Sequence, residues 1–272
     1  MNNQNVYTQV GERYGSAAER SNATYSTNIA KAFGYLNEDL DSIPKEANLG
    51  LSCGTPLAIA SLKEGETVID LGSGAGLDVF LSSGKVGPTG KAIGVDMNRN
   101  MLAKARKLKA DRSIENVEFI ESRIADIALE DNIADCIISN CIVNLVPHDK
   151  KQKAFNEIHR LLKPGGRVAI SDILAKKPLS DDIRNSMALY VGCIAGASQV
   201  VEYEEYLKRA GFTDILITDS NSDLNVYLDA SSDAAAGGCC SAPENMADDL
   251  KGEDLNEWTG IIGGSFKIYA MK

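Results

Sequence analysis

Apolar residues change spacing repeatedly along the chain from Thr67 onward, and this change predicts the fold. Short apolar runs of strand length occur at Thr67–Asp70, Ala92–Asp96, Val117–Glu121, Asp135–Ser139 and Arg167–Asp172. Segments with helical spacing lie between them, at Leu77–Lys85, Asn98–Ala110 and Asp149–Leu162. Strands that alternate with helices indicate βαβ units with right-handed crossovers. We therefore predict an α/β protein with a doubly wound, mostly parallel sheet.

The flanking regions carry weaker patterns. We expect an N-terminal arm with helices over residues 1–50, the sheet domain over 51–176 and a smaller C-terminal α+β part over 177–272. The last part should hold helices near Asp181–Tyr190 and Val201–Ala210, and strands near Ile215–Thr218 and Phe266–Met271. The stretch 231–264 is rich in small and polar residues, which predicts a flexible segment.

Composition narrows the class of protein. Of 272 residues 44% are apolar, yet no run of about eighteen apolar residues suggests a membrane span, and Met1–Gln4 lacks the parts of a signal peptide. We expect a cytoplasmic protein without a membrane partner, in which the six cysteines rest reduced. The net charge of −10 argues against a nucleic-acid partner.

A glycine-rich turn follows the first predicted strand. Gly72, Gly74 and Gly76 form Gly-x-Gly-x-Gly, whereas a dinucleotide site needs a third glycine where Leu77 stands. A generic tight turn is the alternative. Preceded by Asp70, the motif resembles the first motif of class I S-adenosylmethionine (SAM) methyltransferases, which have a Rossmann-like fold. The resemblance implies that this turn, including Ser73, binds the methyl donor.

Further donor residues are expected at the ends of later strands. Asp96 ends the second strand, where a carboxylate accepts hydrogen bonds from ribose hydroxyls in other doubly wound folds. Met97 is a candidate for packing on the adenine, or an ordinary residue leading into a helix. The resemblance implies that Ile124 and Ala125, which follow the third strand, lie beside the adenine, and that Asn140 also belongs to the donor site. Asp126 is either part of the adenine site or only a turn or capping residue.

Three cysteines lie where a second substrate would bind. Cys141 follows the fourth strand by two residues, on the side where ligands bind in open α/β sheets, and Cys193 lies in a stretch of small residues. Cys53 stands before the first strand. Such thiols favour a soft, thiol-seeking substrate. Cys136, in mid-strand, is expected to be a small buried hydrophobe.

The stretches around these thiols resemble arsenite methyltransferases. The resemblance covers about residues 28–220 and rests on four stretches: Ala47 to Gly54, Ser139-Asn140-Cys141-Ile142-Val143-Asn144-Leu145, Leu162-Lys163-Pro164-Gly165-Gly166-Arg167, and Cys193-Ile194-Ala195-Gly196-Ala197. It implies that Cys141 and Cys193 hold trivalent arsenic, that Cys53 assists turnover, and that residues 177–272 contribute to arsenic binding. Arsenite, methylarsenite and their thiol conjugates are the implied substrates.

The resemblance also implies a redox half-reaction. Two protein thiols would become a disulfide during turnover, and thioredoxin or glutathione would reduce it again. Cys239 and Cys240 could capture arsenic or be incidental. Two other functions stay open: methylation of carbon or oxygen on a small organic substrate such as a quinone, and binding of a soft metal without turnover.

Overall fold

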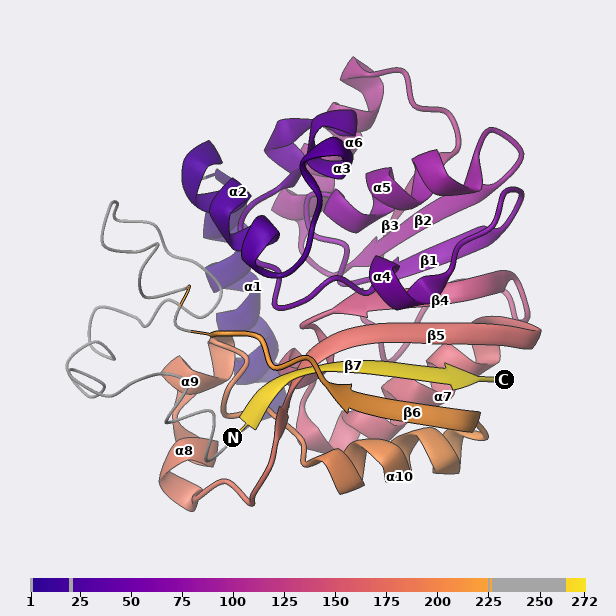
Figure 1. Cartoon of the computed structure of the whole chain (residues 1–272). Coiled ribbons are helices and arrows are strands. Elements are labelled where there is room, and N and C mark those ends of the chain that lie inside the picture. Colours follow the sequence, from indigo (N-terminus) through magenta and orange to yellow (C-terminus); the bar gives the residue numbers. More distant parts are fainter. Residues whose placement is uncertain (1, 20–21, 225, 227–262) are drawn as a thin grey trace.

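A single sheet organises the chain. The computed structural model describes residues 2–19, 22–224, 226 and 263–272. Its strands are β1 (Thr67–Leu71), β2 (Lys91–Asp96), β3 (Val117–Glu121), β4 (Ala134–Asn140), β5 (Leu162–Ala175), β6 (Thr213–Asp219) and β7 (Gly263–Met271). They lie in the order β3-β2-β1-β4-β5-β7-β6 (Figure 1). The first five are parallel, and β7 runs antiparallel to both β5 and β6.

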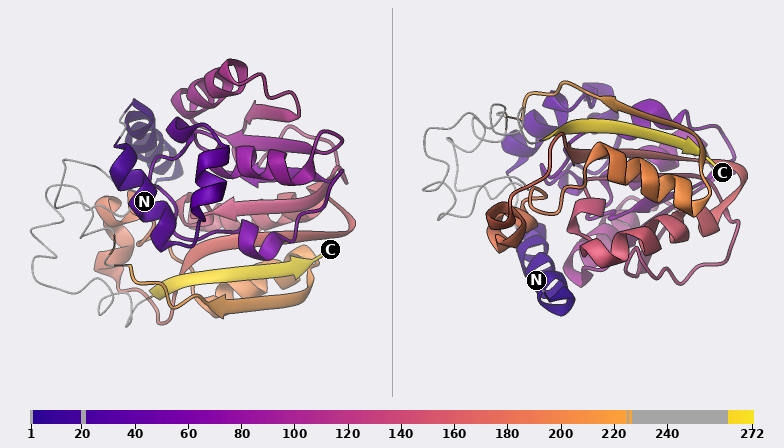
Figure 2. Two further views of the ribbon diagram at one scale, coloured as in Figure 1. Left: turned by 45° about the horizontal axis from the view of Figure 1, so that its top comes forward. Right: turned by 90° about the horizontal axis from the view of Figure 1, so that it is seen from below.

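Helices cover both faces of the sheet and one of its ends (Figure 2). The longer ones are α1 (Asn3–Glu19), α2 (Ala23–Ala32), α5 (Leu77–Val86), α6 (Arg99–Asp111), α7 (Lys151–Leu161) and α10 (Val200–Ala210). The short ones are α3 (Asn37–Ser42), η1 (Lys45–Ala47), α4 (Leu57–Ala60), η2 (Val143–Leu145), η3 (His148–Lys150), α8 (Asp181–Asn185) and α9 (Met187–Val191). No described helix is long and apolar enough to cross a membrane.

Strands β1, β2, β4 and β5 are buried on both faces along most of their length, which explains their nearly continuous apolar runs. Val68 and Cys136 pack with Ala60 of α4 on one face. Ile69 and Leu71, which belong to the other face, join the cluster that contains Phe155 of α7. The expected doubly wound, mostly parallel sheet is confirmed.

The C-terminal region extends this sheet. Strands β6 and β7 pair with each other, and β7 pairs with β5 along nine residues from Arg167 to Ala175. The division at residue 176 stays a prediction. The expected flexible segment 231–264, with Cys239 and Cys240, lies outside the described residues except for Gly263 and Gly264, which begin β7.

One predicted helix is wrong in detail. The segment Asp181–Tyr190 forms two short helices, α8 and α9, instead of one. The break falls at Ser186, whose extended backbone ends α8 while its hydroxyl accepts a hydrogen bond from the Leu189 N–H at 3.3 Å. Serine caps a helix in this way more readily than it continues one.

A nearly buried ion pair fastens the segment before β1 to β5. The Arg167 guanidinium donates to both carboxylate oxygens of Glu66, at 2.9 and 2.8 Å. It also donates to the carbonyls of Ala60 and Ser61. The side chains of Arg167 and Glu66 are only 10% and 13% exposed, so neither charge has full access to water.

We predict that Glu66→Gln lowers the free energy of unfolding by about 2–3 kcal/mol, because it leaves the Arg167 charge buried without a counter-ion. Glu118→Gln is the matched control. Its pair with Lys91 is about half exposed, and such pairs contribute at most about 1 kcal/mol. Urea unfolding measures both. Equal destabilisation by the two substitutions would contradict the structural role of the Arg167 pair.

Candidate functional site

A deep cleft opens at the carboxyl ends of β1, β2 and β4. It encloses about 1090 Å³, including its open mouth. Nine residues expected in the site line it: Asp70, Gly72, Ser73, Gly74, Asp96, Met97, Ile124, Asn140 and Cys141. It lies at the point where the strand order reverses between β1 and β4, which is where doubly wound sheets bind ligands.

The glycine turn between β1 and α5 shapes the floor of this cleft. Gly72 has a φ of 75°, and a Cβ there would lie 2.5 Å from the Ile142 side chain, so only glycine fits. The Gly74 N–H donates to an Asp96 carboxylate oxygen at 2.8 Å, which ties the turn to the end of β2. The turn thus presents backbone directly to the cleft.

Two expected donor residues do not line the cleft within the described part of the chain: Gly76 and Ala125. A Cβ on Gly76 would lie 2.9 Å from the rings of Phe80 and Phe119, so this glycine allows α5 to pack against β3. Asp126 is exposed and pairs with Lys153 at 3.7 Å, which is typical of a surface turn.

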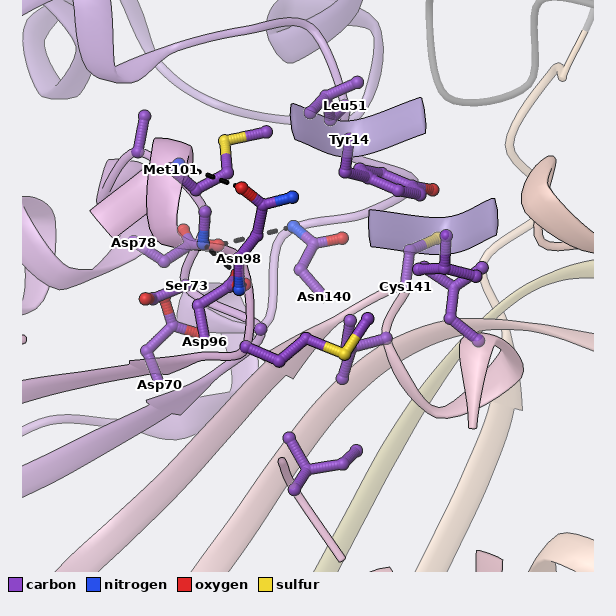
Figure 3. A pocket seen from close by; sticks show the side chains of 18 of the residues that line it. Tyr14, Leu51, Asp70, Ser73, Asp78, Asp96, Asn98, Met101, Asn140 and Cys141 are labelled. Carbon is purple, nitrogen blue, oxygen red and sulfur yellow. Dashed lines mark hydrogen bonds between the residues drawn. The ribbon is translucent and has the colours of Figure 1, made fainter. Parts of the chain in front are cut away.

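Three carboxyl groups gather on one side of the cleft. Asp70, Asp78 and Asp96 lie there, while Cys141 lies on the opposite side and Asn140 between them (Figure 3). Asp96 accepts from the N–H of Asn98 at 2.8 Å in addition to that of Gly74. Asp78 accepts from the Tyr35 hydroxyl at 2.8 Å and from the Asn140 amide at 3.3 Å.

Burial makes ionisation of these acids costly. It raises the pKa of Asp70 well above its usual range, and the neighbouring Asp78 and Asp96 raise that pKa further. Burial also raises the pKa of Asp78 to about 6, although hydrogen bonds from Tyr35 and Asn140 lower it. The pKa of Asp96 is raised by burial, against backbone hydrogen bonds that favour its charged form. A cationic ligand would relieve this repulsion.

The thiols lie beside the cleft. Cys53 and Cys141 are joined by a disulfide, with their Cα atoms 6.0 Å apart, so the expectation that the cysteines rest reduced is wrong for this pair. The Cys193 Sγ lies 3.4 Å from the carbonyl oxygen of Cys141 and 3.5 Å from the hydroxyl of Tyr14 on α1. The structure therefore brings the three expected thiols together, all of them buried, and of the three only Cys141 lines the cleft.

Backbone conformation at two of these thiols is unusual. Cys141 has a φ of 58° and Cys193 a φ of 64°, a left-handed region that costs a residue with a side chain on the order of 1 kcal/mol. The Asn144 amide holds both loops, donating to the carbonyls of Ile173 at 2.6 Å and Cys193 at 3.2 Å. Such conformations persist where surrounding contacts enforce them, and they concentrate at functional sites.

Cys136 lies apart from these three thiols. It lies within β4, fully buried in the core under α4. Burial raises the pKa of its thiol to about 12, so it stays protonated. The expectation that Cys136 is a structural residue agrees with this position.

Sequence reasoning missed several residues of the site. Asp78 gave a usable signal, since it is the one acid of its helix and lies in the first turn, two residues after the glycine turn. Tyr14 gave none, because its place depends on how α1 packs across the cleft. Asp172 of β5 was also missed, although one of its carboxyl oxygens lies within 4.8 Å of the sulfurs of Cys53 and Cys141.

Comparison with known proteins places the chain in a family. A family model described as a methyltransferase domain matches residues 62–211, more than half of the chain. An arsenite methyltransferase of Halobacterium salinarum is 42% identical over 208 residues, which are 76% of this chain and 53% of that protein. The human arsenite methyltransferase is 30% identical, over 81% of this chain and 61% of its own length.

Other relatives share less of the chain. A ubiquinone/menaquinone biosynthesis C-methyltransferase of Escherichia fergusonii is 34% identical, over 48% of this chain and 51% of that protein. A crystal structure of an arsenic(III) SAM methyltransferase from Chlamydomonas reinhardtii superposes with a TM-score of 0.62 at 24% identity, covering 90% of this chain and 73% of that one. This likeness supports the class I methyltransferase fold.

The chain spans between about half and two thirds of the arsenite methyltransferases that it matches. The similarity to them that the cysteine motifs predicted is confirmed. Taken with the match over residues 62–211 and the shared strand order, these findings show that the chain belongs to the methyltransferase-domain family.

Proposed function

We propose that this protein transfers the methyl group of SAM to trivalent arsenic held by the thiolates of Cys141 and Cys193. One observation carries the proposal: three buried cysteines meet at the edge of a cleft whose other side holds three acids. A methyl donor with positive charge suits the acids, and a thiophilic acceptor suits the sulfurs. The named activity of the relatives supports the same reaction.

The binding of SAM is supported by the opposite charges of the donor and the cleft. SAM carries a positive sulfonium and an ammonium group, and the cleft provides Asp70, Asp78 and Asp96. Asp96, at the end of β2, is placed to accept from the ribose hydroxyls, as carboxylates do at this position in other doubly wound sheets. The backbone of Gly72 and Gly74 would lie against the amino-acid end of the donor. Met97 and Ile124 provide apolar walls for the adenine.

The acceptor half needs no general base. Trivalent arsenic has a lone pair and can itself attack the methyl carbon once thiolates fix its position. The sulfonium charge disappears as the methyl group moves, so a cleft with apolar walls near Cys141 favours the transfer. Leu145 and Ile142 supply such walls.

The disulfide between Cys53 and Cys141 fits the redox half of this reaction. Methyl transfer raises arsenic to the formal pentavalent state. Oxidation of two thiols to a disulfide supplies the two electrons that return arsenic to the trivalent state. A dithiol such as thioredoxin, or glutathione, would then reduce the disulfide in the cytoplasm.

We predict that Asp96→Ala weakens SAM binding by more than tenfold, since hydrogen bonds to a charged group contribute about 1.5–3 kcal/mol each. Asp126→Ala is the control, because that acid is exposed and lies outside the cleft. Isothermal calorimetry compares the two. Unchanged affinity in folded Asp96→Ala protein would remove Asp96 from the donor site.

SAM affinity should depend on pH through Asp78. In the ligand-free protein burial raises the pKa of Asp78 to about 6, and a cationic donor favours the ionised form. Affinity should therefore fall as the pH is lowered through 6, by about tenfold between pH 7 and pH 5, with proton release on binding. Asp78→Asn should flatten this dependence. A pH-independent affinity in the wild-type protein would contradict the assignment.

The thiols provide the sharpest test of the reaction. Cys141→Ser or Cys193→Ser puts a hard hydroxyl in place of a soft thiolate, and should remove methylation of both arsenite and methylarsenite while SAM still binds. The loss should exceed the roughly 10–100-fold cost of losing an outer-shell partner. Cys53→Ser should impair arsenite methylation and spare the methyl-transfer step to methylarsenite, which has one fewer site for a thiol, but not the reduction of arsenic that follows it.

Cys136→Ala serves as the matched control for these variants, because Cys136 lies in the core of the sheet, and it should keep most of the activity. For each of the four variants, the assay measures how much label is transferred from methyl-labelled SAM to each arsenical. Full activity in Cys141→Ser or Cys193→Ser would refute the arsenic site and favour methylation of an organic substrate.

A further inference from the structure

A continuous set of hydrogen bonds joins the donor cleft to Cys53. The Tyr35 hydroxyl donates to Asp78 at 2.8 Å and accepts from the Asn140 amide at 3.0 Å. The same amide nitrogen donates to the Gly54 carbonyl at 2.8 Å. The Asn140 Oδ1 accepts from the Cys53 N–H at 3.2 Å and lies 3.7 Å from the Cys53 Sγ.

Tyr35 stands at the buried end of this network. It follows α2, is 4% exposed and packs among Ala30, Leu40 and Val79. Within the described part of the chain it is not one of the residues that line the cleft. Its hydroxyl therefore acts on the cleft through Asp78 and Asn140, and it also hydrogen-bonds the side chain of Ser52, which lines the cleft.

The Cys53 segment has little freedom on its other side. The Cys53 carbonyl accepts from the Ser265 hydroxyl at 2.7 Å, and a Cβ on Gly54 would lie 2.5 Å from that of Ser171. The backbone of Cys53 and Gly54 is thus pressed against β5 and β7. Asn140 contacts the Cys53 backbone as well, and the Asn140 side chain also lines the donor cleft.

We propose that Tyr35 is a positioning residue that couples occupancy of the donor cleft to the redox state of Cys53 and Cys141. The inference rests on the proposed function, because SAM is the cationic donor. A cation bound beside Asp78 keeps that carboxylate charged, and a charged acceptor polarises the Asn140 amide, which makes its Oδ1 a stronger acceptor.

Only reduced Cys53 has an S–H hydrogen, and this difference decides which redox state donor binding favours. In the disulfide, the Cys53 Sγ carries no hydrogen and gains nothing from Asn140. Reduction by a dithiol breaks the Sγ–Sγ bond, delivers two electrons and two protons to Cys53 and Cys141, and closes the disulfide of the reductant. The new Cys53 S–H can donate to Asn140 Oδ1. Donor binding therefore favours the reduced pair, and by reciprocity the reduced protein binds SAM more tightly.

The test measures SAM affinity by calorimetry in the oxidised and in the reduced protein at pH 5.5, where Asp78, with its pKa of about 6, is largely protonated before the donor binds. We expect the reduced wild type to bind at least threefold more tightly, which corresponds to a rise of about 14 mV in the midpoint potential of the disulfide on saturation with SAM. In Tyr35→Phe, and in Asp78→Asn, the ratio should fall toward one. Tyr269→Phe is the control, because that hydroxyl contacts only Met271 among the described hydrogen bonds, and it should keep the ratio.

Two outcomes overturn the coupling: equal SAM affinity in both redox states of the wild type, or a loss of affinity in Tyr35→Phe that is the same in both states. The midpoint potential without donor separates this inference from the proposed function. Tyr35→Phe should make it more negative even if SAM binds to neither state. Equal donor-free potentials in wild type and Tyr35→Phe would show that Tyr35 does not act on Cys53.

Discussion

Parallel pairing of β1 with β2 and β4 is the constraint on which the site depends. In this register Asp70 lies opposite Gly94 on one side and Ile138 on the other, so the three strands end at the same edge. Asp96 and Asn140 end their own strands there, and Cys141 follows at once. Residues far apart in the chain thus face one cleft. A shift of two residues in either pairing would displace the acids relative to the thiols by roughly 6–7 Å.

The two sides of the cleft differ in chemistry. Asp70, Asp78 and Asp96 are held close together with little access to water, which raises the pKa of each and disfavours their joint ionisation. A cationic ligand turns this cost into binding energy. The thiols lie on the other side among apolar residues, and two of them, Cys141 and Cys193, have left-handed backbone conformations. The proposed methyl transfer between the two sides needs only that the donor and the thiol-bound acceptor share the space between them.

Much of this arrangement could be predicted from the sequence. Strands β1, β2, β4 and β5 were evident because strands buried on both faces are largely apolar, and the acids of β1 and β2 followed from their place at the ends of those strands. Other features depend on contacts that no local pattern encodes. Ser186 divides a helix because its hydroxyl finds a backbone partner, and Tyr14 reaches Cys193 because α1 crosses the cleft.

The pairing of Cys53 with Cys141 belongs to the same class of features. The sequence motifs identified three thiols, but which two lie close enough to bond is decided by the path of residues 50–56 along β5. Tyr35 could not be identified for a related reason, since its hydroxyl gains importance from distant partners, among them Asp78 and Asn140 at separations of 43 and 105 positions of the chain.

In the proposed reaction, the acids of the cleft bring a methyl donor against arsenic held by thiols. A single-turnover experiment decides whether this occurs: reduced protein is mixed with one equivalent of arsenite and one of SAM labelled on the methyl group. We expect the label to appear on arsenic as fast as SAM is consumed, at one methyl group per protein. Label that stays on SAM while arsenite is bound, or that moves only when an organic acceptor is added, would contradict it.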